Sequence, residues 1–306
     1  MNTMNDRLLY SVYFAPRGVV RMTLMGQTIA ARHLSPFDRL IGIVGEAGSG
    51  KSMLVKGMFP GLEMTNDDNG VNVRPLPILS VDEGGFFSPH TYHMDIRFES
   101  AFTQMGVLAE AVEAALRLGK RVVVEHFDLL RPFISFNAEL LIGVGEEILV
   151  TRPTIFGPHP ADIAEIVFRS IRYRKMAHTA EDLSERELVN QTQLRFQHGD
   201  VRHGFVLEFD ERPPIDIAQI EAYVLSQIAL DLPVSFRDEN HIMFGDTAHV
   251  CTGPRMHVRS TGEIEGFRMV PEIKYDPMSE KHLLVGLVGG VDLNDVSDLN
   301  RIKGYD

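Results

Sequence analysis

The chain has 306 residues, 44% of them hydrophobic and 24% charged, which is typical of globular proteins and long enough for two domains. No apolar stretch approaches the 18 residues of a membrane-spanning helix, so we expect a protein that does not enter membranes. No signal-peptide pattern opens the chain, and a single cysteine excludes a disulfide framework, so we expect a cytoplasmic protein. The formal net charge of −12 argues against a broad footprint on nucleic acid.

Strand-like and helix-like segments alternate through the first half of the chain. We expect strands at residues 8–14, 40–44, 76–82, 121–125, 138–143 and 147–150. We expect helices at residues 19–32, 53–58 and 97–118. This alternation predicts an α/β fold with a parallel sheet that binds its ligand at the carboxyl ends of the strands.

One segment of eight residues has the complete pattern of a phosphate-binding loop (P-loop), between an apolar strand and a helix. Its residues are Gly45, Glu46, Ala47, Gly48, Ser49, Gly50, Lys51 and Ser52. Glycines let successive backbone N–H groups point inward, and the helix N-terminus adds partial positive charge. Lys51 is expected to reach the β- and γ-phosphates and Ser52 to hold Mg²⁺. The pattern predicts binding of ATP or GTP with Mg²⁺.

Two acidic residues end predicted strands downstream of this loop. Glu125 follows the run Val122–Val124, where a carboxylate can organise the Mg²⁺ shell or polarise a water. Asp82 ends the strand at 76–82 and can accept the proton of a substrate hydroxyl. The alternative for each is an ordinary acid in a loop. We expect both to lie near the γ-phosphate, with Asp82 as the base and Lys51 as a charge clamp.

Residues 38–130 resemble the uridine-kinase and phosphoribulokinase branch of the P-loop kinases, through the loop and the two strands that end in acids. The second half resembles the second additional domain of threonyl- and alanyl-tRNA synthetases, which edits mischarged tRNA. This resemblance covers about residues 175–270. The matching segments are Cys251–Arg268, His203–Asp210, Ile215–Glu221 and His178–Leu183.

Four residues of that half form a candidate metal site. His178 and Asp182 are four residues apart and share one face of a helix, while Cys251 and His257 flank a Gly/Pro turn. Together they offer nitrogen, oxygen and sulfur ligands suited to Zn²⁺; the alternative is a buried polar cluster without metal. Asp182 replaces a histidine of the synthetase pattern. Further candidate ligands are His198, His203, His241 and His249.

These observations predict a P-loop nucleotide-binding domain at residues 1–155 and an α+β, synthetase-editing-like domain at 156–306. The leading interpretation is an ATPase or small-molecule kinase whose second domain binds an amino-acid-like or hydroxylated substrate. One alternative is an aminoacyl-tRNA deacylase with a regulatory nucleotide site, and another is a non-enzymatic, nucleotide-dependent binding module. Residues 151–306 contain 17 basic and 25 acidic residues, a charge of −8 that disfavours tRNA as a partner.

Overall fold

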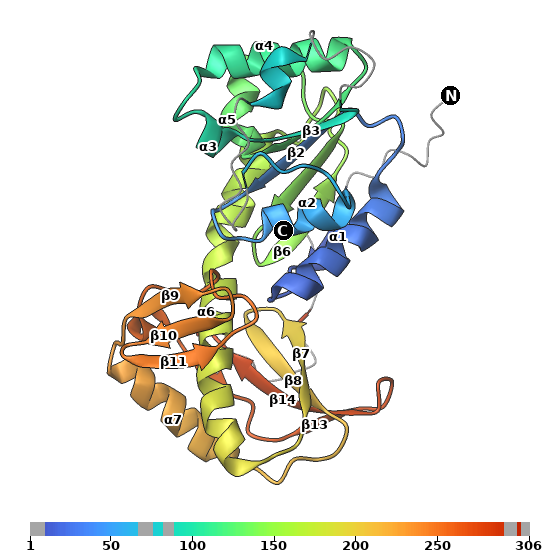
Figure 1. The fold of residues 1–306 in the computed structure, drawn as a ribbon. Coiled ribbons are helices and arrows are strands. Elements are labelled where there is room, and N and C mark those ends of the chain that lie inside the picture. Colours follow the sequence, from blue (N-terminus) through green and yellow to red (C-terminus); the bar gives the residue numbers. More distant parts are fainter. Residues whose placement is uncertain (1–9, 67–75, 82–88, 291–298, 301–306) are drawn as a thin grey trace. The chain divides into compact units, whose positions relative to one another are not determined.

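The chain divides into two compact units (Figure 1). The computed structural model describes residues 10–66, 76–81, 89–290 and 299–300. Unit 1 consists of residues 1–15 and 19–169, and unit 2 of residues 16–18 and 170–306. The division therefore falls inside helix α6 (Pro160–Gln191), whereas the sequence placed a boundary after residue 155.

Unit 1 is built on a mixed sheet whose strands have the order β1-β6-β5-β2-β4-β3. The strands are β1 (Ser11–Phe14), β2 (Leu40–Gly45), β3 (Thr91–Asp95), β4 (Arg121–Glu125), β5 (Leu140–Val144) and β6 (Glu147–Thr151). The four strands β5, β2, β4 and β3 run parallel, while β6 is antiparallel to both of its neighbours, β5 and β1. The predicted α/β class is confirmed, but the sheet is not wholly parallel. Only Gly145 and Glu146 connect β5 to β6, and so short a connection requires antiparallel strands.

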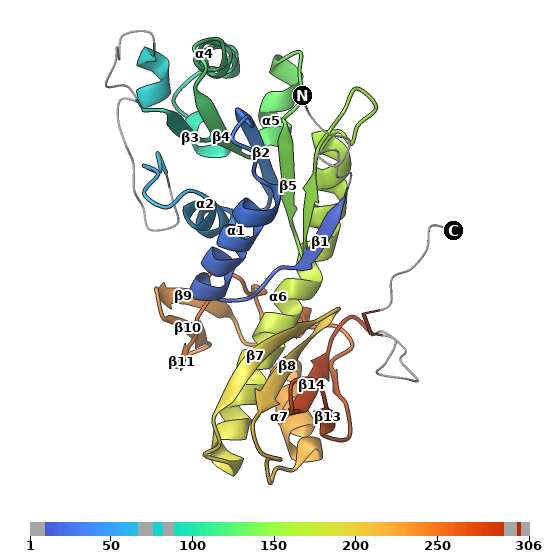
Figure 2. The ribbon, with the colours of Figure 1, turned by 90° about the vertical axis from the view of Figure 1, so that its right-hand side faces the viewer.

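Helices cover both faces of this sheet. Alternate residues of each buried strand point to opposite faces, so apolar side chains on each face need helices to cover them. Ile41 and Ile43 of β2 pack in one core with α1 (Val19–His33) and α2 (Lys51–Met58), which lie side by side in Figure 2. Leu40 packs in the other core with α4 (Met105–Arg117), α5 (Phe127–Leu130) and the first turns of α6. A Cβ on Gly57 would lie 2.0 Å from the Thr23 carbonyl oxygen, so glycine permits the close crossing of α1 and α2.

Two expectations about unit 1 need correction, and some of its elements were not predicted. Pro77–Ser80 forms a 3₁₀ turn rather than a strand, because proline lacks a ladder N–H and suits a first helical position. The helix expected at 97–118 is divided into α3 (Ile96–Glu99) and α4. The Ser100 hydroxyl donates to the Arg97 carbonyl near this break and competes with the helical ladder. Strand β3 was not predicted, and Arg131–Phe133 adds a short 3₁₀ turn.

Unit 2 combines two helical segments with antiparallel sheets. One sheet has the order β12-β14-β8-β7, with β13 paired to β14, and the other has the order β11-β10-β9. Its strands are β7 (Phe196–Val201), β8 (Gly204–Phe209), β9 (Val234–Asp238), β10 (His241–Phe244), β11 (Thr247–Val250), β12 (Arg268–Met269), β13 (Lys274–Asp276) and β14 (Lys281–Leu287). The core lies between α6, α7 (Ile217–Ala229) and these sheets. Residues Thr261–Glu263 form a 3₁₀ turn.

The short segment Pro16–Gly18 belongs to unit 2 because of the buried side chain of Arg17. Its guanidinium donates to Glu181 Oε2 at 2.8 Å and to the carbonyls of Gly199 and Gly204 at 3.0 and 3.1 Å. It also lies 3.3 Å from Asp200. One arginine thereby joins this segment to α6, β7 and β8.

Candidate functional site

The segment Gly45–Ser52, here called the phosphate-loop segment, connects β2 to α2 in unit 1. Gly48 and Gly50 have φ angles of 77° and 91°, in the left-handed region that favours glycine. The Ser49 amide donates to the Glu46 carbonyl at 3.2 Å, which closes a tight turn. The segment then enters α2, whose first-turn N–H groups have no partner within the helix and can bind an anion.

Lys51, Ser52 and Glu125 meet at the base of this segment. The Lys51 ammonium, 4% exposed, donates to the Glu46 carbonyl at 2.8 Å and lies 3.9 Å from Glu125 Oε2. The Ser52 hydroxyl donates to the same carboxylate oxygen at 3.4 Å. Burial raises the pKa of the Glu125 carboxyl, but His93, Lys51 and Ser52 outweigh burial and hold the pKa below its ordinary value. Glu125 is therefore ionised and, with Ser52, offers oxygen ligands that could hold a cation.

His93, on the strand that the sequence did not predict, orients Glu125. The Thr65 amide donates to His93 Nδ1 at 3.2 Å, so the ring proton is on Nε2 and is donated to Glu125 Oε1 at 3.1 Å. The ring is 1% exposed. Nothing in the sequence indicated that His93 orients Glu125, because its two hydrogen-bond partners, Thr65 and Glu125, are distant from it in sequence.

A pocket of about 370 Å³ lies over these residues and is lined by the phosphate-loop segment and β3. It contains Asp95, Arg97 and His126, which were not selected from the sequence. Asp95 ends β3 beside Glu125 in the sheet register and accepts hydrogen bonds from the Phe98 amide and from Asn66. The acid expected from Asp82 falls outside the described residues, so its role stays a prediction.

His126 begins α5 in a left-handed conformation, with φ of 56°. Burial, followed by repulsion from Lys51, lowers the pKa of its imidazole to about 3. Its pKa in the unfolded chain is near 6.5. Between these values the unfolded chain binds a proton that the folded unit does not, so stability falls as the pH falls from about 6.5 towards 3.

The variant His126→Asn should therefore weaken this loss of stability on acidification, by up to about 1.4 kcal/mol per pH unit. Asparagine tolerates positive φ and preserves the start of α5. The measurement is urea unfolding followed by circular dichroism from pH 4 to pH 7. His90→Asn, at an exposed position of the same unit, is the control and should match the wild type. Equal pH slopes in His126→Asn and wild type would contradict the assignment.

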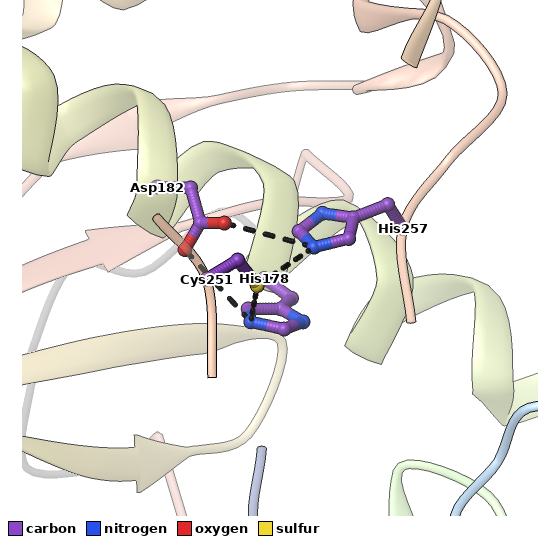
Figure 3. Close-up of side chains that lie close together, drawn as sticks. All are labelled: His178, Asp182, Cys251 and His257. Carbon is purple, nitrogen blue, oxygen red and sulfur yellow. Dashed lines mark hydrogen bonds and ion pairs between the residues drawn. The ribbon is translucent and has the colours of Figure 1, made fainter. Parts of the chain in front are cut away.

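In unit 2 the structure brings His178, Asp182, Cys251 and His257 together (Figure 3). Cys251 Sγ lies 3.5 Å from His178 Nε2 and 3.2 Å from His257 Nε2. The Asp182 carboxylate lies 3.8 Å from the first imidazole and 3.6 Å from the second, and the two rings stack at 4.2 Å. One ligand atom from each residue lies within 4.8 Å of the others, so the group could hold a metal ion. Whether it does stays a prediction.

Burial controls the charges of this cluster. It lowers the pKa of His178 well below its ordinary value and that of His257 to about 3, so both rings are neutral. It raises the pKa of the Cys251 thiol and, together with Glu185 and Glu181, that of the Asp182 carboxyl. The His178 Nδ1–H donates to the Met256 carbonyl at 3.0 Å, which leaves Nε2 as an acceptor towards Cys251.

The four other histidines considered from the sequence lie in different surroundings. His198 is 3.1 Å from Glu181 and 3.4 Å from Glu185, and these three residues form another group that could hold a metal ion. His249 joins a third such group with Asp182 and Glu185. His203 stacks on Tyr173 and His241 pairs with Asp238.

Comparison with known proteins places the chain in no family. No family model matches, and no curated protein matches. One similar solved structure is the ornithine aminotransferase of Toxoplasma gondii, crystallised in the presence of oxidised glutathione with partial occupancy of PLP. Its sequence is 11% identical, the match covers 81% of this chain and 67% of that chain, and the TM-score is 0.25. The enzyme of Toxoplasma gondii ME49 is 10% identical over 83% and 70%, with a TM-score of 0.22.

These comparisons correct the expected family. No family model and no curated protein supports a P-loop kinase or a tRNA synthetase editing domain, so the two resemblances drawn from the sequence are withdrawn. ATP or GTP with Mg²⁺ and Zn²⁺, which were expected as cofactors on those resemblances, are withdrawn with them. At such TM-scores the matches carry no argument that this chain shares the aminotransferases' fold or ligand. The described fold and sites define a mixed α/β protein with antiparallel sheets in its second unit.

Among the described residues, no helix combines the length and apolar character required to cross a membrane.

Proposed function

We propose that unit 1 binds the phosphate chain of a nucleotide substrate in the phosphate-loop segment and catalyses hydrolysis or transfer of a phosphoryl group. One observation carries this proposal: the buried Lys51, Ser52 and Glu125 meet within 4 Å at the entry to α2. The proposal rests on this geometry and on the loop's chemistry, and not on a family assignment.

Each group has a role in such a reaction. Backbone N–H groups of the loop and the start of α2 receive phosphate oxygens, and Lys51 leaves the Glu46 carbonyl to neutralise the charge that moves to the leaving oxygen. Glu125, held by His93, orients the attacking water or hydroxyl and accepts its proton as the new P–O bond forms. Asp95 lies at the same end of the sheet and positions Asn66 beside the pocket.

Unit 2 is proposed to bind a small second ligand, amino-acid-like or hydroxylated, in a pocket of about 560 Å³. This volume is within the usual range for small-molecule sites. If nucleotide binding occurs without turnover and instead controls binding of this ligand, the chain is a nucleotide-dependent binding module rather than an enzyme. Steady-state phosphate release, with and without candidate small molecules, distinguishes the two functions.

The variant Lys51→Ala should bind phosphate chains about 10- to 100-fold more weakly than the wild type. It loses a charge-assisted contact of roughly 1.5–3 kcal/mol, and each 1.4 kcal/mol is a factor of ten in affinity. Isothermal titration with sodium tripolyphosphate and with a purine nucleoside triphosphate measures the loss and separates recognition of phosphate from recognition of the base.

Lys56→Ala is the matched control, because Lys56 lies on the same helix but does not line the pocket. It should bind like the wild type. Equal affinity of Lys51→Ala and Lys56→Ala for both ligands would reject the phosphate site. Binding of tripolyphosphate with no release of phosphate from any nucleotide would retain the site but reject the reaction.

A further inference from the structure

The pocket of unit 2 has a polar base and apolar walls. Asp182 and Glu185 of α6 line it together with His249 of β11. Val189, Phe196 and Val250 also line it, and the two valines are exposed. At about 560 Å³, the pocket has room for a small organic molecule rather than for a bare ion alone.

Three buried polar side-chain atoms on the floor of this pocket have no hydrogen-bond partner among the described residues. They are Asp182 Oδ2, Glu185 Oε1 and His249 Nε2. Asp182 is 4% exposed, so its Oδ2, which lies 3.6 Å from His257 Nε2 and 4.0 Å from His249 Nε2, is hidden from bulk water. Buried polar atoms normally have partners, and one without a partner costs about 1–3 kcal/mol. One ligand atom from each of the three residues lies within 4.8 Å of the others. Their positions therefore fit a single donor group.

Beside these atoms, His198 Nδ1 lies 3.4 Å from Glu185 Oε1 without hydrogen-bond geometry. Two arginines also line the pocket: Arg17 pairs with Glu181 and Asp200, and the Arg186 guanidinium lies over Phe244, 5.5 Å from the ring centroid. Within the described part of the chain, no lysine or arginine nitrogen lies within 4 Å of the Asp182 or Glu185 carboxylates.

We infer that this pocket binds an organic cation through a primary ammonium group, which Asp182, Glu185 and His249 receive. An ammonium has three N–H donors and no acceptor, which suits the two carboxylate oxygens and, in the tautomer with its proton on Nδ1, His249 Nε2. The apolar walls at Val189, Phe196 and Val250 suit the hydrocarbon part of the ligand, and an aromatic ring beside a cation adds attraction. The inference rests on the proposed function only in that it specifies the second ligand; it needs no phosphate chemistry.

The first test uses the wild-type chain without nucleotide and compares three probes of similar size. Ligand-detected NMR measures binding of n-butylammonium, 1-butanol and butyrate, each up to 10 mM. We expect n-butylammonium to bind with a dissociation constant in the millimolar range, and the neutral and anionic probes to bind at least tenfold more weakly. Equal binding of the three probes would overturn the inference. Mn²⁺ is a fourth probe; if Mn²⁺ binds and n-butylammonium does not, the pocket is a metal site and the inference fails.

The second test uses the variant Glu185→Gln, which retains the shape of the side chain but removes its charge. It should bind n-butylammonium about tenfold or more weakly, while Glu263→Gln, at an exposed position of unit 2, should bind like the wild type. Equal affinities in the two variants would reject Glu185 as a ligand. If Glu185→Gln does not fold, the selectivity of the wild type for the ammonium probe still decides the question. Phosphate binding at Lys51 is measured separately, so failure of either proposal leaves the other intact.

Discussion

Replacing Arg17 with methionine should lower the free energy of unfolding of unit 2 by about 3–5 kcal/mol, the usual consequence of removing one partner from a buried ion pair. Methionine has a similar volume but cannot donate. The Glu181 carboxylate, 1% exposed, then loses its 2.8 Å partner, and the carbonyls of Gly199 and Gly204 lose their donors. Burial raises the pKa of Glu181, but Arg17 and then His198 outweigh it and hold the pKa below its ordinary value.

The lowered pKa of Glu181 determines how the loss of stability in Arg17→Met depends on pH. A carboxyl whose folded pKa is depressed stabilises the fold above its unfolded pKa, near 4.3, and loses that contribution as the pH falls through the folded value. The penalty of Arg17→Met should therefore be complete at neutral pH and smaller in acid. Adding Glu181→Gln should recover part of the loss, because the unpaired charge is then absent.

Hydrogen exchange measured by mass spectrometry suits this test, because a chain of two units need not unfold in one step. Protection of the amides of β7 and β8 should fall in Arg17→Met. Arg212→Met, at an exposed position of unit 2, should change stability by no more than about 0.5 kcal/mol. Unchanged protection of residues 196–209 in Arg17→Met would show that this arginine does not join the segments of unit 2.

The largest effect on the proposed reaction should come from Glu125→Gln, with a loss of turnover of about 10²–10⁴-fold, the range for removal of a general base. Glutamine preserves the volume and can still accept from His93 Nε2, which lies 3.1 Å from Oε1. It cannot accept a proton from an attacking water or hydroxyl. Tripolyphosphate affinity should stay within a few-fold of the wild type, because Lys51 and the backbone of the loop remain.

Phosphate release under saturating nucleotide measures the loss, and titration with tripolyphosphate measures binding in the same preparation. Glu110→Gln, at an exposed position on α4, is the control and should retain full turnover. If Glu125→Gln retains more than a tenth of the wild-type rate, Glu125 does not act as the base. Asp95 would then be the next acid to replace, since it also lines the pocket.

The sequence by itself determined the features that depend on local spacing. Helix α1 and strands β2 and β4 are formed by contiguous residues whose periodicity determines their conformation, and the structure has them where they were expected. Phosphate binding by the loop between β2 and α2 stays a prediction. The sequence also selected Glu125, because it ends an apolar run. It selected His178 with Asp182 through helical spacing, and Cys251 with His257 through a short turn.

Only the tertiary structure decided which distant residues meet. Ser52 and Glu125 are 73 residues apart, and so are His178 and Cys251, so no local pattern fixes their distances. The same holds for His93, whose burial is acceptable only because Thr65 and Glu125 satisfy its two nitrogens. The pocket of unit 2 depends on α6 and β11 folding together, which brings Glu185 and His249 close to each other on the floor of the pocket. Hydrogen bonds and burial across such separations reflect the whole chain, whereas strand and helix patterns reflect only their own residues.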